Sequence, residues 1–536
     1  MAEASLQLGN GNWAGKSSNL LAYHKVDTNF YADELTFTRA STGTIVNAEG
    51  LIEEVPYNVM PNSEPTSTGA FKTNVTFQAT NIYGWNGIYY GDNSVRRIAF
   101  LAATAVVGQE YTFSAFVKMT DGSSPSVGNS ATDDFRMWNG SATTSGLTIT
   151  DVGGGIYRCS VVRVATSTAN NVALEKQTYN SAKTFEASGF QLVLGSTAKT
   201  YYPTTTRLNI PRVDYLNNAN GSLLLEGQRT NALTYSIDFG QSFYIKDSGV
   251  SVGTTNNTSP SGLLDATKID VTNGNRIYAN VTSGSYIGSV FIKAGTFSYF
   301  KFLGGNLDLV LGTISGGTIE DYGNGWYRVS KAITSIRPFQ IEAYPDSTYS
   351  AHTTSGNYYI YGAQAEIGSY PTSYIPTSGA TVTRLADSSS TTGLTSVIGQ
   401  TEGTWQVKFT KDNIDSYRMM TLWGGVSNRL IIYTLGDNLK VFCTSGGVNQ
   451  FDLIVSSAIG NGTFNVAFAY KANDFKVYVN GVSVYTNTSA SVPISLNDLL
   501  FAQTDTGNLA FNHRVDAVTL FKTRLTNTEL ATLTTL

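Results

Sequence analysis

Polar and apolar residues alternate along many short segments of the chain. Clear examples are Tyr111–Lys118 (YTFSAFVK), Tyr286–Lys293 (YIGSVFIK) and Phe464–Tyr470 (FNVAFAY). A period of two residues indicates a β-strand with one buried face. Such strands recur at a spacing of roughly 8–12 residues, with Gly, Asn and Asp between them, which is typical of β-sandwiches and jelly rolls. We therefore expect an all-β fold.

Two of these strands belong to an internal repeat. Three blocks recur in the same order after roughly 170–177 residues: Tyr111–Lys118 recurs as Tyr286–Lys293, Gly153–Ser160 (GGGIYRCS) as Gly323–Ser330 (GNGWYRVS), and Gly189–Thr205 as Gly362–Ser378. Three matched blocks in one order indicate a duplicated module.

The length of 536 residues requires several domains, because a single core stops growing near roughly 250–300 residues. We predict an N-terminal segment over 1–56 and a first jelly-roll-like module over 57–211. Its duplicate follows over 212–388, and a sandwich of a different pattern occupies 389–536.

The last part contains a hairpin signal. Asn480-Gly481 separates two alternating strands within Phe475–Tyr485 (FKVYVNGVSVY). An Asn-Gly pair between alternating segments favours a two-residue type I′ turn, because both residues accept positive φ.

A short helix is expected after these strands. Thr526 and Glu529 have the spacing of a capping box. Leu525 and Leu530 fit the hydrophobic staple that accompanies such a box. The segment RLTNTELATL therefore predicts one helix at the end of the chain.

The composition narrows the classes of partner. Only 14% of the residues are charged and the net charge is −4. Because Lys and Arg are not clustered, we expect no nucleic-acid binding. The N-terminus has neither a basic start nor an apolar core, and no apolar run approaches the roughly 20 residues that span a bilayer. We therefore expect no signal peptide and no membrane insertion.

The two cysteines, Cys159 and Cys443, lie in strand-like segments far apart in the sequence. Buried thiols explain both more simply than a disulfide does. Folding in a reducing cytoplasm is the expectation.

Residue types also bear on catalysis. A glycosidase needs two carboxylates, roughly 5–10 Å apart. The last part holds only two glutamates, Glu402 at its start and Glu529 at the predicted helix cap. Aspartates occur there as well, among them Asp437, Asp452, Asp505 and Asp516, but they form no same-face pair at a spacing of two. We therefore predict that the chain is not an enzyme.

Histidine chemistry and bound cofactors are equally unsupported. The only histidines are His24, His352 and His513, in three separate regions, so neither a catalytic triad nor a histidine metal site is indicated. No Gly-rich phosphate loop precedes a helix. We predict no cofactor and no metal ligands, while a Ca²⁺ site at loop residues such as Asp505 and Asp516 stays open.

Exposed aromatic residues are the candidates for binding. Sugar sites stack rings on aromatics, with Asn, Asp or Gln nearby. Trp85, Tyr89 and Tyr90 lie beside Gly and Asn in YGWNGIYY, and Trp138 precedes Asn-Gly at an expected turn. We take these four as glycan-binding candidates on loops; the alternative is that each Trp is core or an inter-domain contact. The other strand tryptophans, Trp326, Trp405 and Trp423, are expected to be core.

The last part resembles laminin-G and concanavalin-A-like domains. The resemblance lies in FNVAFAYKANDFKVYVNGVSVY and in the closing FNHRVDAVTLFKTRLTNTELATL. It implies a lectin-like sandwich of about 140 residues, whose last core strand is followed by a small helical cap. It says little about ligand, because such sandwiches occur in lectins, adhesive modules and enzymes.

The remainder is similar to head-fibre and tail-fibre proteins of bacteriophages, including those of crAss-like gut phages. The similar segments are Phe37–Thr42 (FTRAST), Gly50–Asn58 (GLIEEVPYN), Leu223–Ser236 (LLLEGQRTNALTYS) and Ala363–Arg384 (AQAEIGSYPTSYIPTSGATVTR). The resemblance implies jelly-roll carbohydrate-binding-like modules in a virion fibre or spike.

Several expectations follow from that resemblance. The protein would be made in the host cytoplasm and lie on the virion surface as a dimer or trimer. Its segment 1–56 would attach to capsid or tail proteins, and its modules would contact host or environmental glycans. The alternatives are a glycan-degrading depolymerase on the same scaffold and a bacterial surface adhesin, of which the second lacks a signal peptide and a cell-wall anchor.

Overall fold

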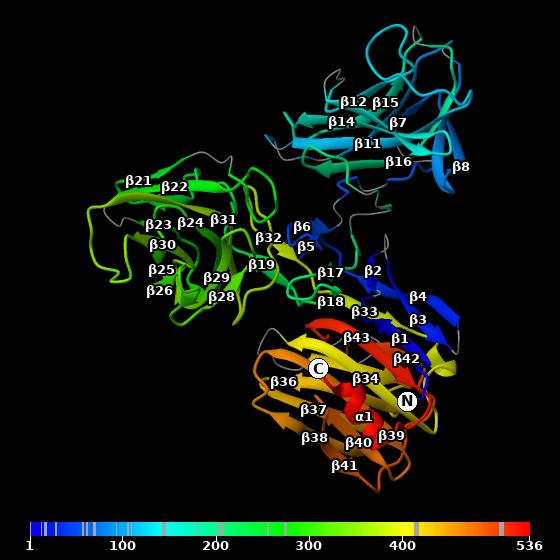
Figure 1. Cartoon of the computed structure of the whole chain (residues 1–536), viewed down its shortest axis with the longest axis vertical. Helices are drawn as coiled ribbons and strands as arrows, with labels where there is room; N and C mark the ends of the chain where they lie inside the picture. The colour runs from blue at the N-terminus through cyan, green and yellow to red at the C-terminus, as the bar shows by residue number, and fades with distance from the viewer. Residues whose placement is uncertain are drawn as a thin grey trace. The chain divides into compact units, whose positions relative to one another are not determined.

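The computed structural model describes residues 2–11, 13–15, 19–26, 29–55, 58–60, 63–67, 71–92, 94–103, 105, 107–108, 110–141, 146–178, 181–199, 201, 203–204, 208–253, 257–272, 276–411, 418–502 and 509–536. They form two compact units, one made from the described residues of 55–210 and the other from those up to 15, 19–54 and 211–536 (Figure 1). The fold is all-β, as predicted, and helix in the described part is confined to η1 (Leu394–Ser396) and α1 (Asn527–Thr534).

The smaller unit is a sandwich of two antiparallel sheets. The first sheet has the order β13 (Leu147–Gly153), β14 (Ile156–Val164), β11 (Glu110–Met119), β16 (Phe185–Leu194), β9 (Trp85–Tyr90) and β8 (Thr76–Ile82). The second has the order β12 (Arg136–Asn139), β15 (Val172–Lys176), β10 (Arg97–Leu101) and β7 (Phe71–Thr73). Alternate residues of both sheets, such as Phe113 and Leu174, meet in one apolar core.

The second sandwich belongs to the larger unit and repeats this plan. One sheet has the order β21 (Val250–Val252), β22 (Thr267–Thr272), β31 (Ser355–Ile367), β24 (Gly284–Ala294), β29 (Trp326–Ser335) and β28 (Thr318–Asp321). The other has the order β20 (Tyr244–Lys246), β23 (Arg276–Ala279), β30 (Phe339–Tyr344), β25 (Tyr299–Phe302), β26 (Gly305–Asp308) and β27 (Thr313–Ile314). Its core includes Val290, Phe300 and Ile341.

The two sandwiches share an irregularity at the same place. The register between β11 and β16 shifts between Ser114 and Phe116, and that between β24 and β31 shifts between Ser289 and Phe291. The strand opposite each shift contains a glycine with positive φ, Gly189 in the first sandwich. An identical bulge at matched sites agrees with the duplication.

A buried hydrogen-bond arrangement is also repeated. In the second sandwich, Asn231 accepts from the backbone NH groups of Leu233 and Ala365 at 3.1 Å each. In the first, Asn58 accepts from the NH groups of Met60 and Leu192 at 3.2 Å each. The sequence repeat therefore extends further upstream than the three blocks indicated.

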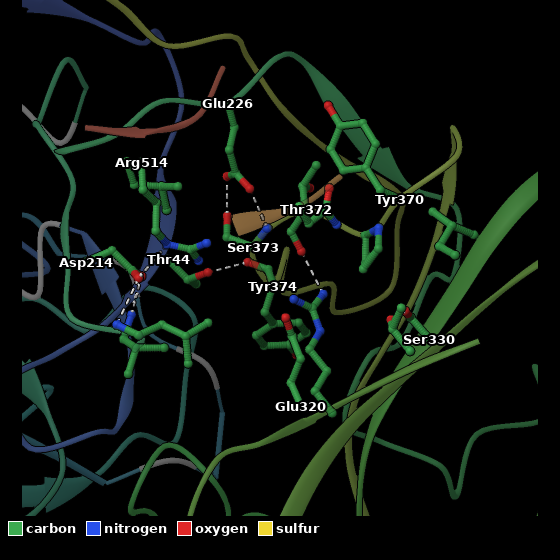
Figure 2. A pocket seen from close by; sticks show the side chains of 18 of the residues that line it. Thr44, Asp214, Glu226, Glu320, Ser330, Tyr370, Thr372, Ser373, Tyr374 and Arg514 are labelled. Carbon is green, nitrogen blue, oxygen red and sulfur yellow. Dashed lines mark hydrogen bonds and ion pairs between the residues drawn. The ribbon is translucent and has the colours of Figure 1, made fainter. Parts of the chain in front are cut away.

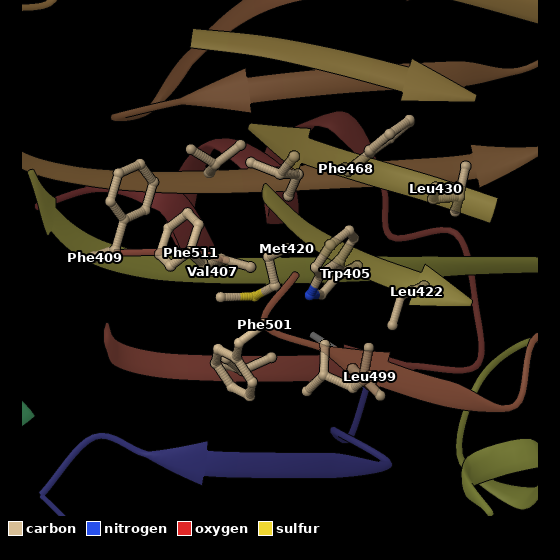
Figure 3. Close-up of a cluster of buried hydrophobic side chains, with 14 of the residues drawn as sticks. Trp405, Val407, Phe409, Met420, Leu422, Leu430, Phe468, Leu499, Phe501 and Phe511 are labelled. Atoms are coloured by element: carbon tan, nitrogen blue, oxygen red, sulfur yellow. The ribbon is translucent and has the colours of Figure 1, made fainter. Parts of the chain in front are cut away.

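The third sandwich has two large sheets. The first contains β17 (Val213–Asp214), β18 (Ser222–Leu224), β43 (Arg514–Phe521), β34 (Glu402–Lys411), β39 (Gly462–Lys471), β40 (Phe475–Val479) and β41 (Val482–Asn487), with β1 (Leu6–Gly9) paired to β43. The second contains β2 (Trp13–Gly15), β3 (Asn19–Val26), β4 (Asn29–Thr38), β33 (Ser388–Thr391), β42 (Asp498–Leu500), β35 (Arg418–Trp423), β36 (Arg429–Leu435), β37 (Asn438–Ser445) and β38 (Val448–Ser457). Figure 3 shows Trp405, Phe409 and Phe501 in the core between them.

Strands β1 to β4 of the N-terminal segment are part of this third sandwich, whereas we expected a separate segment over 1–56. Leu6 pairs with Leu520 in β43, and Ser389 in β33 pairs with Phe37 in β4. Leu6 and Phe37 lie in the core. The third sandwich is therefore assembled from several separate stretches of sequence. Two further pairs of strands, β5 (Gly43–Val46) with β6 (Ile52–Val55) and β19 (Arg229–Asn231) with β32 (Val382–Arg384), lie in the linking segments.

Local predictions for the last part are confirmed. Asn480 and Gly481 have φ values of 49° and 83° between β40 and β41, as a type I′ turn requires. Thr526 and Glu529 form the capping box of α1. Leu525 packs in the same apolar cluster as Leu530.

The predicted core residues are also buried. Trp326, Trp405 and Trp423 are at most 7% exposed. The two cysteines, Cys159 and Cys443, are free and buried, and burial raises the pKa of each thiol to about 12. Neither is therefore a reactive thiolate at neutral pH.

Candidate functional site

The outward face of the four-stranded sheet in the first sandwich carries a polar and aromatic cluster. Met137 and Leu174 point into the core, so their neighbours Trp138 and Glu175 point outward. Trp138 lies edge-on to Phe100 of β10, with the ring centroids 5.5 Å apart. The guanidinium of Arg136 lies 5.3 Å from the centre of the Trp138 ring. Side chains of three adjacent strands therefore meet on one surface.

Glu175 is the centre of this cluster. Its Oε2 accepts from the indole Nε1 of Trp138 at 2.6 Å and from Nε of Arg136. Its Oε1 accepts from Nε of Arg96 and from the amide of Gln177. A carboxylate offers about four lone-pair sites, so these four donors use its accepting capacity.

The electrostatics fix Glu175 as a carboxylate. Burial alone would raise its pKa, but hydrogen bonds from Arg136, Arg96 and Trp138 lower it below the ordinary value. The side chain of Glu175 has no exposed surface, whereas those of Arg96 and Arg136 are 49% and 21% exposed. The cluster thus presents cationic donors and an aromatic ring to solvent over a hidden anion.

The second sandwich has a counterpart in the same register. Glu175 stands opposite Arg136 of β12, and Glu342 stands opposite Lys301 of β25. Oε1 of Glu342 accepts from the amide of Gln340, and its Oε2 accepts from the hydroxyl of Tyr344, each at 2.8 Å. Glu342 is half-buried. Both modules therefore display a carboxylate at the centre of this sheet, next to a basic residue.

Of the four predicted binding residues, Trp138 lies in this cluster, but on a strand rather than a turn. Tyr90 is wholly buried, stacks on Phe185 and donates its hydroxyl to the carbonyl of Leu174 at 3.2 Å. The prediction that Tyr90 is exposed on a loop is therefore wrong. Gly87 interrupts the apolar pattern of β9, which made a strand look like a loop.

Trp85 and Tyr89 lie on the other sheet of the first sandwich. Trp85 packs against Phe116 and Tyr201, with centroid distances of 5.4 and 4.4 Å. Tyr89 is half-buried and pairs with Glu186 of β16, on the face opposite the core. The structure therefore does not bring these two residues to Trp138.

Sequence reasoning missed Arg96, Phe100, Arg136 and Glu175. One signal was present: in Val172–Lys176 (VALEK), the charged residues Glu175 and Lys176 directly follow an apolar run within one strand. A buried charge needs a partner, so this glutamate pointed to an unrecognised polar cluster. Arg136 and Trp138 come from β12 and Arg96 from the residue before β10, so these partners have no sequence spacing in common with Glu175.

A cleft of about 660 Å³ lies within the larger unit (Figure 2). Its lining includes Glu320 and Ser330 from the second sandwich and Arg514 from β43. Asp214 accepts from Nε of Arg514 at 3.2 Å. A cavity of this volume is large enough for a small ligand.

A buried ion-pair cluster adjoins this cleft. Arg212 donates to Glu226 from Nη1 at 2.7 Å and also pairs with Asp387. Nη1 of Arg39 donates to Asp387 at 2.9 Å, and Nη1 of Arg384 lies 2.8 Å from Glu226 Oε2. We refer to these five residues as the ion-pair cluster. All but Glu226, which is 13% exposed, are almost completely buried.

The carboxylates at the cleft are held by strong donors. Burial would raise the pKa of Glu226, but Arg384 and Arg212 outweigh burial and hold it far below its ordinary value. The backbone NH and the hydroxyl of Ser373 also donate to Glu226, at 2.8 and 2.7 Å (Figure 2). A carboxyl held in this way does not carry a proton at neutral pH, so it is unsuited to general-acid chemistry.

The described residues lack two further kinds of site. They contain no helix that is long and apolar enough to cross a membrane. They also contain no group of three or more His, Cys, Asp or Glu side chains arranged to hold a metal ion. Asp505, one of the loop carboxylates considered for Ca²⁺, lies outside the described residues.

No protein-family model and no curated protein matches this chain. Among solved structures it is similar to the CBM40 domain of a Ruminococcus gnavus sialidase bound to α2,3-sialyllactose, with 17% identity, 26% of this chain and 86% of that chain covered, and a TM-score of 0.23. It is similar to a tandem CBM22 domain from Paenibacillus barcinonensis, with 10% identity, 62% and 100% covered, and a TM-score of 0.21. It is also similar to the LG1-3 region of the laminin α2 chain, with 9% identity, 79% of this chain and 95% of that chain covered, and a TM-score of 0.18.

Proposed function

We propose that the chain is a glycan-binding protein and that the first sandwich binds sugar on the outward face of β12, β15 and β10. The observation that carries this proposal is the cluster of Trp138, Phe100, Arg96 and Arg136 around Glu175. Sugar recognition combines an aromatic surface with a few fixed polar groups. Here the polar groups are fixed by Glu175, so little conformational entropy is lost when a ligand is bound.

The matched face of the second sandwich supports the same function. Tyr278 of β23 is half-buried on the outward face, with the guanidinium of Arg337 4.4 Å from its ring centre. Glu342 and Gln340 lie on the same face of β30. Two such faces in one chain would raise avidity for a polymeric glycan without any further contact.

Binding to a glycan array by the full chain tests the proposal. We expect Trp138→Ala to abolish or weaken at least one signal by roughly tenfold or more, because the ring surface on which a sugar would stack is lost and a factor of ten corresponds to only about 1.4 kcal/mol. Tyr83→Ala is the matched control, since Tyr83 is an exposed aromatic of the same sandwich that packs against Trp85 of the other sheet and is not among the binding candidates. No array signal above background, or signals equally strong in Trp138→Ala, would overturn the proposal.

We further propose that binding is not coupled to cleavage. Glu226, a carboxylate lining the cleft, is neutralised by Arg212 and Arg384. Asp214 is paired with Arg514. Release of reducing sugar from any polysaccharide that the chain binds, lost in Glu320→Gln, would instead support the depolymerase alternative.

The finer proposal is that this glycan-binding chain is a dimeric or trimeric fibre or spike subunit on a bacteriophage virion, made in the host cytoplasm. Its support is the resemblance of Leu223–Ser236 and Ala363–Arg384 to phage fibre segments. Attachment to capsid or tail proteins would use the N-terminal strands, which lie in the third sandwich. Immunogold labelling of purified particles, together with the mass in solution, tests this. A monomer absent from any virion would overturn it.

A further inference from the structure

The two matched sheet faces differ in what their central carboxylates can still accept. Glu175 accepts from four donors, Trp138, Arg136, Arg96 and Gln177. A carboxylate with about four lone-pair sites therefore has none left for a ligand hydroxyl. The groups that this face offers to solvent are then N–H donors and ring surfaces.

Arg96 and Arg136 are held in the same manner. Each donates to Glu175 through Nε. The two terminal nitrogens of each guanidinium make no hydrogen bond within the described residues. These nitrogens belong to side chains that are 49% and 21% exposed. A guanidinium carries five N–H donors in a rigid fork, so most of its donors are oriented yet unused.

We propose that this face of the first sandwich binds the anionic group of an acidic saccharide, a carboxylate or a sulfate, between the terminal nitrogens of Arg96 and Arg136. This inference rests on the proposed glycan-binding function. Planar guanidinium groups match the geometry of carboxylate and other oxyanions. Two arginines and one glutamate also leave the cluster with one net positive charge.

The face of the second sandwich serves as an internal comparison. Among the described residues, Glu342 accepts from two donors, Gln340 and Tyr344, and it is half-buried rather than hidden. Its remaining lone pairs can accept from sugar hydroxyls. The residue that matches Arg136 is Lys301, which has no planar fork. The duplicated faces have therefore diverged at these positions, and among the described residues only the first face holds two guanidinium groups on its central carboxylate.

Binding of the full chain to a panel of acidic polysaccharides tests this inference. Each acidic member is paired with a carboxyl-reduced or a desulfated counterpart, so the two sources of negative charge are separated. We expect at least one acidic member to bind and to lose about 10- to 100-fold in affinity when the responsible charge is removed. Arg96→Gln should cause a loss of the same order.

Two variants make the result specific. Arg136→Lys keeps the charge and copies the second sandwich, so it should lower affinity for the acidic member with little change for a neutral one. Lys118→Gln removes an exposed charge from the other sheet of the same sandwich and should have no effect.

The outcomes separate the two claims. If binding that depends on Trp138 is unchanged by carboxyl reduction and by desulfation, the preference for an anion is overturned, while glycan binding stands. If no panel member and no neutral glycan shows binding that depends on Trp138, the glycan-binding function fails as well.

Discussion

Arg39 and Asp387 lie 348 positions apart in the sequence, yet Nη1 of Arg39 donates to Oδ1 of Asp387 at 2.9 Å and neither side chain is exposed. Asp387 also pairs with Arg212, and its backbone NH donates to the carbonyl of Glu226 at 2.9 Å. Asp387 follows β32, Arg39 follows β4, and Arg212 lies at the start of the linker before the second sandwich. The carboxylate of Asp387 therefore joins three segments that are far apart in the sequence.

Removing this carboxylate should be costly. Asp387→Ala leaves Arg39, Arg212 and Arg384 buried around the single charge of Glu226. Breaking a buried ion pair by deleting one partner costs about 3–5 kcal/mol, and we expect a loss of that size for the larger unit. Denaturant unfolding followed by tryptophan fluorescence measures it. Asp270→Ala, in an exposed pair with Lys268, is the control and should match the parent. Equal stabilities of the two variants would contradict the prediction.

The same cluster should make the larger unit sensitive to acid. The folded pKa of Glu226 lies below its ordinary value of 4.5, because Arg384 and Arg212 outweigh burial. A carboxyl with a depressed folded pKa contributes stability that is complete above the unfolded pKa and is lost as pH falls toward the folded one. We expect the melting temperature to fall progressively below about pH 4.5, and Glu226→Gln to flatten that fall while lowering the melting temperature at pH 7.

Asp516 provides the matched control for the acid experiment. Burial raises the pKa of Asp516 despite hydrogen bonds from Ser222 and Asn218. Protonation of Asp516 at low pH therefore relieves the cost of burying its negative charge. It does not remove an interaction that stabilises the folded state. Asp516→Asn should not flatten the fall in melting temperature. If it does so as strongly as Glu226→Gln, the assignment of the acid response to the ion-pair cluster is wrong.

Trp85 is expected to act in packing rather than in binding. Its ring contacts Tyr83, Phe116 and Tyr201, with centroid distances between 4.4 and 5.4 Å. Because the ring is only half-buried, Trp85→Ala should cost the smaller unit somewhat less than a full core deletion, about 2–3 kcal/mol. Trp85→Phe should recover most of this loss. Calorimetry of the variants tests it, and glycan binding lost in Trp85→Ala without any loss of stability would contradict it.

Local features were predictable from the sequence, whereas pairing between distant strands was not. The Asn480-Gly481 turn and the capping box of α1 depend on neighbouring residues, so their patterns are sufficient. By contrast, β1 shows no preference in its sequence for β43 over any other edge, because alternation sets the buried face and not the partner. The cluster around Glu175 was missed for the same reason, since Trp138, Arg96 and Glu175 come from separate segments.

The duplicated bulge offers a test of the fold that uses both copies. Gly189 and Gly362 have φ values of 57° and 61°. A Cβ atom at either position would lie 2.9 Å from Cδ2 of the facing phenylalanine, Phe116 or Phe291. Substitution by alanine therefore adds a steric clash to the cost of a left-handed backbone.

We expect Gly189→Ala and Gly362→Ala each to destabilise its own sandwich by about 2–3 kcal/mol, of which roughly 1 kcal/mol is backbone strain. Gly154→Ala isolates the strain, because Gly154 has a φ of 65° and no atom lies within 4 Å of its added Cβ. In the double variant with Phe291→Leu, the cost of Gly362→Ala should fall toward that of Gly154→Ala, since the facing ring has been removed. Equal losses in all three single variants would show that the close contact contributes nothing and that strain alone selects glycine at the bulge.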